Sequence, residues 1–597
     1  MNRQRFLNLV LLTAATGFAA CSGDDDEEKT SGAEVLDAGA ETPRAGSGAK
    51  SGSSGKGGSG SAGKGGAGGN KASTDEGSSA GGKSAAEGGK KSEGSGGKAA
   101  DSGGSSGSEE DAGVDVPFYP PVEKVADRVI TQANDLRGLT FGKSGKIWAS
   151  GHTDADPMNR KLVLARFNAD GTPDTSFDED GYLVYDVVMG DEQSLGLAEL
   201  KNGDVVVQAN VSDGRGGAPI VDTAGGADGV RANGSNVVLL RFTSEGKLVE
   251  SFGQGGIAQL QLGWAPEDDE SWPAPTFNSM AAMENQKYSG PGYPSDQAWG
   301  VLLDASGEEE KLVINAFGPA KKVDADQRFD NDRYVFRVLA STGALDPAFN
   351  GGKPYTFNTQ GTLSDGGRRA FVEADGSIVS SGYTNFGMNL GNHVVLLRLK
   401  PDGTPDTSFG FGSVDQPGIA TFNPFVDIGG AAECYAVKRA ENGRYITTGY
   451  GRATAANMTS KFGYATSDGP DLVSFAVKAD GSGVDTAWGI EGTRAIQSEE
   501  KGLAGTEDRG RDLVVLKDGR SVQVGRFGVA PAVFVVTPDG VLDPRSGDKG
   551  VISYTPFGGM TTSHFFAVAL SADGKQIVTA TNNHAEGVLL AVLKVSE

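Results

Sequence analysis

Large apolar side chains are missing from one long stretch of this chain. From Ala38 to Gly113 the sequence holds no Val, Ile, Leu, Met, Phe, Trp or Tyr. Such a stretch cannot bury enough surface to offset the conformational entropy that folding removes. The sequence therefore predicts a disordered Gly/Ser/Ala/Lys-rich linker over 22–115 and confines the folded part to 116–597.

Cysteine and histidine are also scarce, with two and four copies in 597 residues. Within the expected folded part, 116–597, the spacings HExxH, GxSxG and the P-loop do not occur, so the sequence predicts no catalytic residue and no metal ligands. The default expectation for histidines in loops and at strand ends is that they are solvated: His152, His393, His564 and His584. Cys434 lies in an apolar strand pattern and is expected to be a small buried side chain.

Basic residues are outnumbered by acidic ones, and the formal net charge is −24. This balance argues against nucleic acid or anionic headgroups as partners. It fits a soluble envelope protein, most simply a monomer.

The first residues have the pattern of an export signal, here 1–21. Arg3 and Arg5 precede an apolar run over 6–18, which is too short to span a bilayer. The run ends in Phe-Ala-Ala-Cys21, which resembles the lipobox of bacterial lipoproteins. That resemblance implies a lipid anchor on Cys21, and Ser22 after it favours the outer membrane, with the chain facing the periplasm or the cell surface. The alternative is an ordinary secretory signal with an incidental cysteine.

Two short patterns alternate through the rest of the chain. In one, a Gly turn joins two apolar segments, as in 139–151 and 197–209, with further turns at Gly307, Gly376, Gly443, Gly519 and Gly574. In the other, an apolar segment precedes a turn, as in 162–177 and 396–409, with further turns at Gly246, Gly343, Gly481 and Gly540. Asp-Gly and Asn-Gly suit tight hairpins because Gly tolerates φ > 0.

Each repeat therefore supplies four short strands, a to d, with tight a–b and c–d turns. Seven repeats of four antiparallel strands predict an all-β fold, a seven-bladed β-propeller. The chain ends on a c strand, and 122–131 stands where a d strand belongs. We expect this N-terminal strand to complete blade seven and close the ring.

The string Asp-Gly-x-x-Asp-x-x-Phe, clearest at 170–177 and 402–409, resembles the delta-60 repeat of propeller-forming proteins in environmental bacteria. The likeness covers 122–597. It implies a propeller lipoprotein and brings no defined activity with it.

An acidic residue follows each c–d turn, and arginines recur in the c strands. The acids are Asp174, Asp346, Asp406, Asp485 and Asp543, and the arginines are Arg166, Arg241, Arg337 and Arg398. A residue repeated in nearly every blade favours structural pairing or turn capping. A weaker alternative is calcium bound by the oxygen-rich segment 168–174, which lacks the terminal bidentate Glu of a calcium loop. No other cofactor is expected.

Every long insertion falls in a b–c or d–a connection, which places all of them on one face of the ring. They are 213–236, 264–297, 317–332, 451–471 and 492–510. The second carries the candidate ligand-binding residues Trp264, Trp272, Tyr288 and Tyr293, since exposed aromatics suit sugars or peptides. The alternative is that they form a small core of their own.

These features favour a non-enzymatic binding or scaffold protein, held by a lipid anchor and serving a protein or glycan partner in the cell envelope. The alternative is a propeller enzyme, a glycan lyase or hydrolase, with carboxylates such as Asp268, Asp269 and Glu270 on the same face.

Overall fold

The fold is known from a computed structural model. It describes residues 118–155, 159–187, 191–212, 218–219, 231–232, 236–260, 262, 296–319, 331–359, 364–386, 391–412, 414, 416–426, 430–452, 470–498, 508–554, 563–582 and 587–596. Cys21, both predicted N-terminal segments and the four candidate aromatics lie outside these residues. Across the described ranges, no helix is long and apolar enough to cross a membrane.

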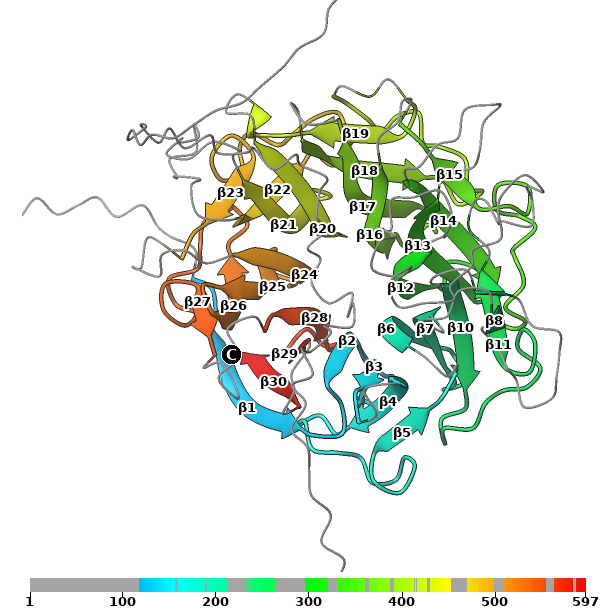
Figure 1. The fold of residues 1–597 in the computed structure, drawn as a ribbon. Helices are drawn as coiled ribbons and strands as arrows, with labels where there is room; N and C mark the ends of the chain where they lie inside the picture. Colours follow the sequence, from blue (N-terminus) through cyan, green and yellow to red (C-terminus); the bar gives the residue numbers. More distant parts are fainter. Residues whose placement is uncertain are drawn as a thin grey trace, which may run out of the picture. The chain divides into compact units, whose positions relative to one another are not determined.

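Seven four-stranded antiparallel sheets stand around a common centre, which confirms the seven-bladed β-propeller (Figure 1). Blades one to three, each from the innermost strand outward, are β2 Asp135–Phe141, β3 Ile147–Thr153, β4 Lys161–Phe167, β5 Tyr182–Tyr185; β6 Asp191–Glu199, β7 Val205–Ser212, β10 Asn236–Phe242, β11 Ile257–Leu260; and β12 Gln297–Asp304, β13 Lys311–Pro319, β14 Asn331–Leu339, β15 Tyr355–Phe357.

Blades four to seven follow the same plan. Their strands are β16 Asp365–Val372, β17 Ile378–Asn385, β18 Asn392–Leu399, β19 Ile419–Phe422; β20 Ala431–Arg439, β21 Tyr445–Arg452, β22 Asp471–Val477, β23 Thr493–Ile496; β24 Arg509–Val515, β25 Ser521–Phe527, β26 Ala530–Val536, β27 Val551–Ser553; and β28 Phe565–Leu570, β29 Gln576–Thr581, β30 Val588–Val595, β1 Val122–Ile130. β8 Ala218–Pro219 and β9 Arg231–Ala232 pair with each other in a separate two-stranded sheet.

Blade seven closes the ring with the two ends of the folded chain. β1 pairs along β30 from Val122 opposite Val595 to Ile130 opposite Val588. The backbone amide of Ser596 donates to the carbonyl of Pro121 at 2.9 Å, which extends the ladder by one more bond. Figure 1 shows β1 as the outer strand of this blade. The predicted closure strand is confirmed.

The hydrophobic core lies between neighbouring blades. One cluster joins Trp148 and Leu164 of blade one to Val207 and Val238 of blade two. Trp148 is buried, as expected. Cys434 is fully buried in a similar interface, and burial raises the pKa of its thiol to about 12. The predicted role of Cys434 as a small core side chain is confirmed.

The strand order also confirms the difference between the two faces. In a blade of this topology, the a–b and c–d turns lie on one face, and the b–c and d–a connections lie on the other. The insertions follow β7, β11, β13, β21 and β23, so they belong to the second face, where connections vary from 2 to 36 residues. On the first face the a–b turns have 5 or 6 residues and the c–d connections 14 to 19, so their lengths are nearly constant. We call these the tight-turn face and the elaborated face.

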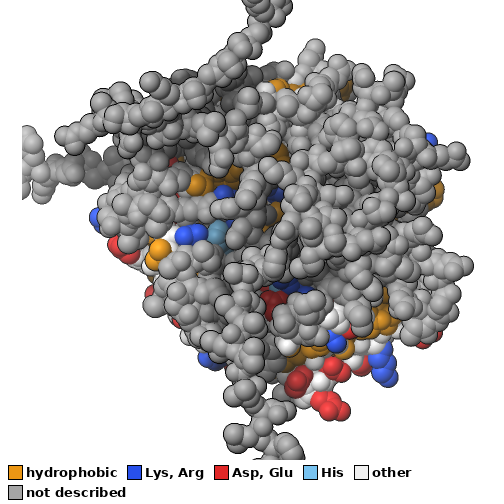
Figure 2. Space-filling view, viewed as in Figure 1, with side chains coloured by type: hydrophobic (Ala, Val, Ile, Leu, Met, Phe, Trp, Pro, Cys, Tyr) orange, Lys and Arg blue, Asp and Glu red, His pale blue; other side chains and the backbone are white. Residues whose placement is uncertain are grey.

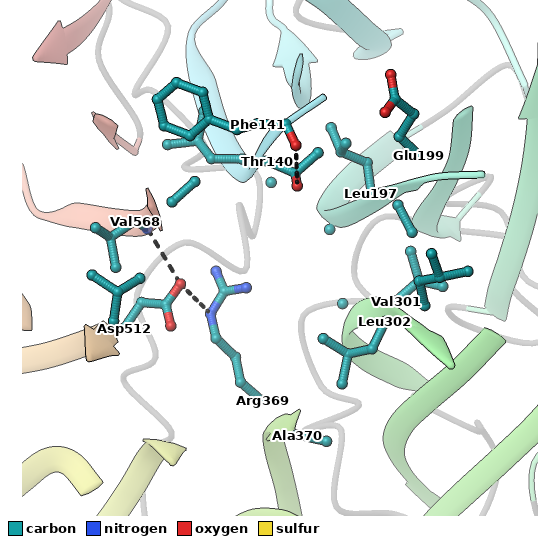
Figure 3. A pocket seen from close by; sticks show the side chains of 18 of the residues that line it. Thr140, Phe141, Leu197, Glu199, Val301, Leu302, Arg369, Ala370, Asp512 and Val568 are labelled. Atoms are coloured by element: carbon teal, nitrogen blue, oxygen red, sulfur yellow. Dashed lines mark hydrogen bonds and ion pairs between the residues drawn. The ribbon is translucent and has the colours of Figure 1, made fainter. Parts of the chain in front are cut away.

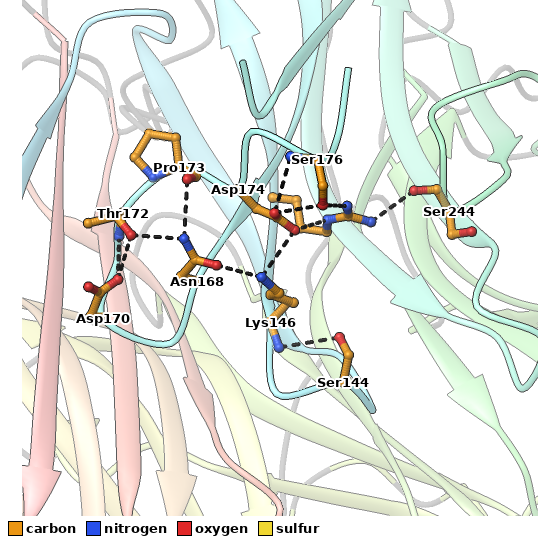
Figure 4. Close-up of polar contacts among 10 residues, drawn as sticks. Ser144, Lys146, Asn168, Asp170, Thr172, Pro173, Asp174, Ser176 and Ser244 are labelled. Carbon is orange, nitrogen blue, oxygen red and sulfur yellow. Dashed lines mark hydrogen bonds and ion pairs between the residues drawn. The ribbon is translucent and has the colours of Figure 1, made fainter. Parts of the chain in front are cut away.

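The repeated Asp and Arg residues fasten the tight-turn face together. The Asp174 carboxylate accepts from Arg166 Nε at 2.6 Å and caps the following turn through Ser176 (Figure 4). Arg166 also donates to the carbonyl of Ser244 in blade two at 2.9 Å. The corresponding c-strand pairs are Arg337 with Asp346 and Arg398 with Asp406. In blades five and six the acid pairs with an arginine at the end of the a–b turn, Arg444 with Asp485 and Arg520 with Asp543. In blade two Arg241 pairs with Asp204 of the a–b turn. Structural pairing and turn capping are therefore confirmed.

The aromatic residue that ends the repeat string packs beneath the next blade. A Cβ placed on the turn glycine Gly246 would lie 3.2 Å from the Phe177 ring. The same relation holds for Phe252 and Gly343, Phe349 and Gly403, Phe409 and Gly481, and Trp488 and Gly540. The turn glycine thus supplies a positive φ and also leaves room for the neighbouring aromatic ring.

Replacing Gly481 by Ala separates these two roles. Gly481 and Gly145 both have positive φ, 67° and 76°, but a Cβ at Gly481 would overlap the Phe409 ring, whereas one at Gly145 meets no atom within 4 Å. We expect Gly145→Ala to cost about 1–2 kcal/mol from backbone strain alone. Gly481→Ala should cost about 1–3 kcal/mol more from overpacking. Urea unfolding measures both, and equal losses would refute the packing role.

Candidate functional site

A β-bulge interrupts the innermost strand of every blade. In β2 the ladder to β3 skips Arg137, and in β28 the ladder to β29 skips Phe566. The other skipped positions are Leu195, Trp299 with Gly300, Arg368 with Arg369, Tyr435 and Arg511. Because a bulge re-aims a side chain, these residues leave the blade interfaces.

The bulge residues meet at the centre of the ring and fill it. The Trp299 ring stacks on Phe566 and packs edge-on against Tyr435, with both centroid distances 5.5 Å. Arginines cover the rings, with Arg137 4.5 Å from the Phe566 centroid and Arg368 4.5 Å from that of Trp299. We call this layer the central plug: Arg137, Leu195, Trp299, Arg368, Tyr435, Arg511 and Phe566, all of them buried.

The arginines of the plug have partners on its elaborated side. Arg137 pairs with Asp135 at 2.6 Å, and Arg368 pairs with Glu433 at 3.1 Å. Arg511 Nε donates to Nδ1 of His564 at 3.2 Å. Burial, with Arg511 and other nearby arginines, holds the pKa of His564 well below its ordinary value. His564 is therefore a neutral acceptor.

The expectation of solvated histidines is wrong for the three that the structure describes. His152 and His564 are 0% and 3% exposed, and His393 is 9% exposed beside the Phe386 ring. His152 lies between Asp135 and Asp154, at 3.6 and 3.5 Å. Burial and two arginines nevertheless lower its pKa strongly. These side chains contact buried charged or aromatic neighbours instead of solvent. His584 lies outside the described residues.

Arg369 crosses from blade four to the opposite side of the ring. Its guanidinium donates to the carbonyls of Arg137 at 2.9 Å, Phe566 at 3.2 Å and Leu195 at 3.4 Å. Its Nε lies 3.5 Å from Asp512 Oδ2 of blade six. A dashed line marks this ion pair in Figure 3. One side chain therefore connects five of the seven blades beneath the plug.

A cavity of about 500 Å³ lies between the plug and the tight turns. All seven innermost strands contribute to its wall, so it is the central channel on that side. Figure 3 shows Arg369 and Asp512 in the cavity wall among apolar side chains that include Leu197, Val301 and Val568. The long insertions lie on the other face, so the cavity and the elaborated face are separate candidate sites.

The segment considered for calcium is engaged with the protein itself. Asp170 accepts from the backbone amide and hydroxyl of Thr172, and Asn168 Oδ1 accepts from Lys146 Nζ (Figure 4). Lys146 Nζ also lies 3.4 Å from Asp174. These contacts form a turn network. No group of three or more His, Cys, Asp or Glu side chains arranged for a metal occurs among the described residues.

Sequence reasoning missed the plug and the cavity. One signal was present, an Arg two or three positions after an Asp at the start of an inner strand, as in Asp135–Arg137, Asp365–Arg368 and Asp508–Arg511. The alternation of apolar and polar residues along a strand does not predict where a bulge occurs. The extra residue of a bulge reverses which of the following side chains point inward and which point outward.

The family model that matches this chain is a β-propeller domain of unknown function, DUF5122, over residues 144–177 and 373–409. These two segments contain the repeat string of blades one and four. No curated protein matches the chain.

Solved structures with a similar fold are distant. PorZ, a surface component of the type-IX secretion system of Porphyromonas gingivalis, is 11% identical with a TM-score of 0.33, over 76% of this chain and 46% of its own. Prolyl oligopeptidase B from Galerina marginata is 9% identical with a TM-score of 0.35, over 75% and 48%. A PL25 ulvan lyase is 10% identical with a TM-score of 0.38, over 80% and 96%. The chain thus spans about half the length of the first two.

Proposed function

We propose that this protein is a non-enzymatic binding or scaffold lipoprotein, anchored through Cys21 in the outer membrane. In this proposal its elaborated face binds a protein or glycan partner in the cell envelope. The observation that carries it is the difference between the faces. One face has connections of nearly constant length fastened by inter-blade contacts, and the other receives the insertions, whose lengths vary widely. Loops that vary on a rigid scaffold are where binding usually occurs.

The point at which the chain enters the propeller supports this orientation. Val122 begins β1 beside the last residues of β30, and its amide donates to Ser546 Oγ near the c–d turn of blade six. Phe118 packs against Arg545 in the same region, 4.1 Å from ring centroid to guanidinium. The described part of the chain therefore begins at the tight-turn face, and the elaborated face lies on the opposite side.

We propose that the residues that bind the partner are Trp264, Trp272, Tyr288 and Tyr293. The connection between β11 and β12 contains all four, so it joins the outer strand of blade two to the inner strand of blade three on the elaborated face. Aromatic rings supply contact area for sugars or peptides at low entropic cost. The delta-60 likeness of the repeats fits this assignment, because it implies a propeller lipoprotein without a defined reaction.

A crossed experiment tests the anchor and the binding face together. Cells express three proteins: the native chain, the Cys21→Ser variant and a variant with the four aromatics changed to Ala. Crosslinking in cells captures protein partners from the envelope, and a glycan array tests the purified proteins for glycan binding. We expect Cys21→Ser to release the chain from the membrane fraction and to keep partner binding. The aromatic variant should stay in the membrane fraction and bind at least about tenfold less, as loss of a hot spot does.

Phe118→Ala is the matched control for the aromatic change. Phe118 is 75% exposed and lies on the tight-turn face, so its loss should leave partner binding intact. Membrane retention of Cys21→Ser would contradict the anchor. Unchanged binding by the aromatic variant, or turnover of a bound glycan, would contradict the binding role.

A further inference from the structure

Five ionisable side chains line the central cavity: Lys143, Glu199, Arg369, Lys438 and Asp512. Two of them are engaged at its outer rim. Glu199 accepts from the backbone amide of Lys143 at 2.7 Å and from Trp148 Nε1 at 3.2 Å. Lys143 Nζ donates to the carbonyl of Leu200 at 3.0 Å.

Arg369 and Asp512 are engaged at the inner end. Arg369 donates to three carbonyls of the inner strands and lies beside Asp512. Asp512 accepts from the backbone amides of Leu513 at 2.9 Å and Val568 at 3.3 Å. Both groups are therefore committed to holding the strands together (Figure 3).

Lys438 differs from the other four. It lies near the end of β20 and is half-buried in the cavity wall. Within the described ranges, no hydrogen bond or ion pair holds its ammonium, and its contact is the Phe371 ring, 5.5 Å from Nζ to centroid. Burial and Arg369 lower the pKa of Lys438, and Asp512 partly opposes them. A desolvated ammonium without an anionic partner is unfavourable.

The balance of charges points to one class of ligand. Three cations and two anions line the cavity, so one positive charge is left over, and the unpaired cation is Lys438. The remaining wall includes Val301, Val514 and Val568, and a volume of about 500 Å³ is ordinary for a small-molecule site. A single negative charge would balance the site, whereas a dianion would be repelled by Glu199 and Asp512.

We propose that this cavity binds a small organic carboxylate, with its carboxylate on Lys438 and its apolar body against the inner strands. The site lies on the tight-turn face and is independent of the partner proposed for the elaborated face. The overall acidity of the protein disfavours anions at its surface, so the local positive charge is a feature of the cavity itself.

Matched ligand pairs test this proposal on the full chain by calorimetry. The probes are 4-phenylbutyrate and indole-3-propionate, each against its neutral primary amide. We expect the native protein to bind each carboxylate at least about tenfold more tightly than its amide, as a charged hydrogen bond would. Lys438→Met should abolish that preference, and Lys438→Arg should keep it.

Lys353→Met is the control, because Lys353 is exposed and does not line the cavity. It should not change the preference, and neither should the loss of the four aromatics on the elaborated face. The proposal is overturned if the native protein binds neither carboxylate, if it binds acid and amide equally, or if Lys438→Met retains the preference. If Lys438→Met does not fold, the proposal is judged from the binding of the acid and amide pairs to the native protein and to Lys438→Arg.

Discussion

A chain that lacks residues 120–131 should melt far below the intact protein. The deletion removes β1, whose Val122 and Ile130 are 1% and 3% exposed and belong to two separate core clusters. Burying two such side chains contributes about 3–6 kcal/mol, a large part of a total stability near 5–15 kcal/mol. The loss also leaves β30 as an open edge that invites aggregation. Differential scanning calorimetry measures the effect.

A circular permutant tests whether stability depends on the presence of β1 or on its position at the start of the folded sequence. Ser596 and Pro121 are hydrogen-bonded, so an Asn-Gly turn between them can make β30 and β1 an ordinary hairpin, with the chain starting at Gln132. We expect the permutant to keep nearly the native melting temperature. An unchanged melting temperature after deletion, or a collapsed permutant, would contradict closure by β1.

Arg369→Met is expected to have the second largest effect on stability. The change leaves the carbonyls of Arg137, Leu195 and Phe566 without this donor and leaves Asp512 without its guanidinium. Removing one partner of a buried charged network costs roughly 3–5 kcal/mol. The stability of Arg369→Lys should lie between those of the native protein and Arg369→Met, because an ammonium group keeps the charge but lacks the planar set of donors of a guanidinium. Urea unfolding gives the three values.

Arg439→Met is the matched control for this change. Arg439 pairs with Glu373 at 3.0 Å, but its side chain is 35% exposed. Exposed pairs contribute about 0–1 kcal/mol, so this variant should be close to native. If Arg369→Met were no more harmful than Arg439→Met, the bridging role of Arg369 would be wrong.

The sequence allowed the blades to be predicted because their signals are local. Gly171, Asp174 and Phe177 stand at fixed positions in one repeat, and each has a separate role in the turn or in the next blade. The closure strand followed from counting strands at the two ends. His152 and His564 are buried against side chains such as Asp135 and Arg511, and a repeat pattern does not describe these contacts.

The candidate sites were predicted less well, for a related reason. The plug needs seven bulges to meet at one axis, and each bulge alone is a small irregularity in a short strand. Lys438 has no motif around it, and its environment comes from β16 and β24 in other blades. Sequence reasoning found the elaborated face because insertions are visible as breaks in the repeat spacing.

Closure by β1 also sets an order of events during synthesis. β1 is synthesised long before β30 and has to wait for it, since contacts such as Ser596 to Glu123 span 473 residues. Blade seven cannot form until β30 has been translated, and contacts at this separation form slowly. For a chain proposed to cross a membrane, this delay is useful, because the polypeptide can be translocated more easily while the ring is still open.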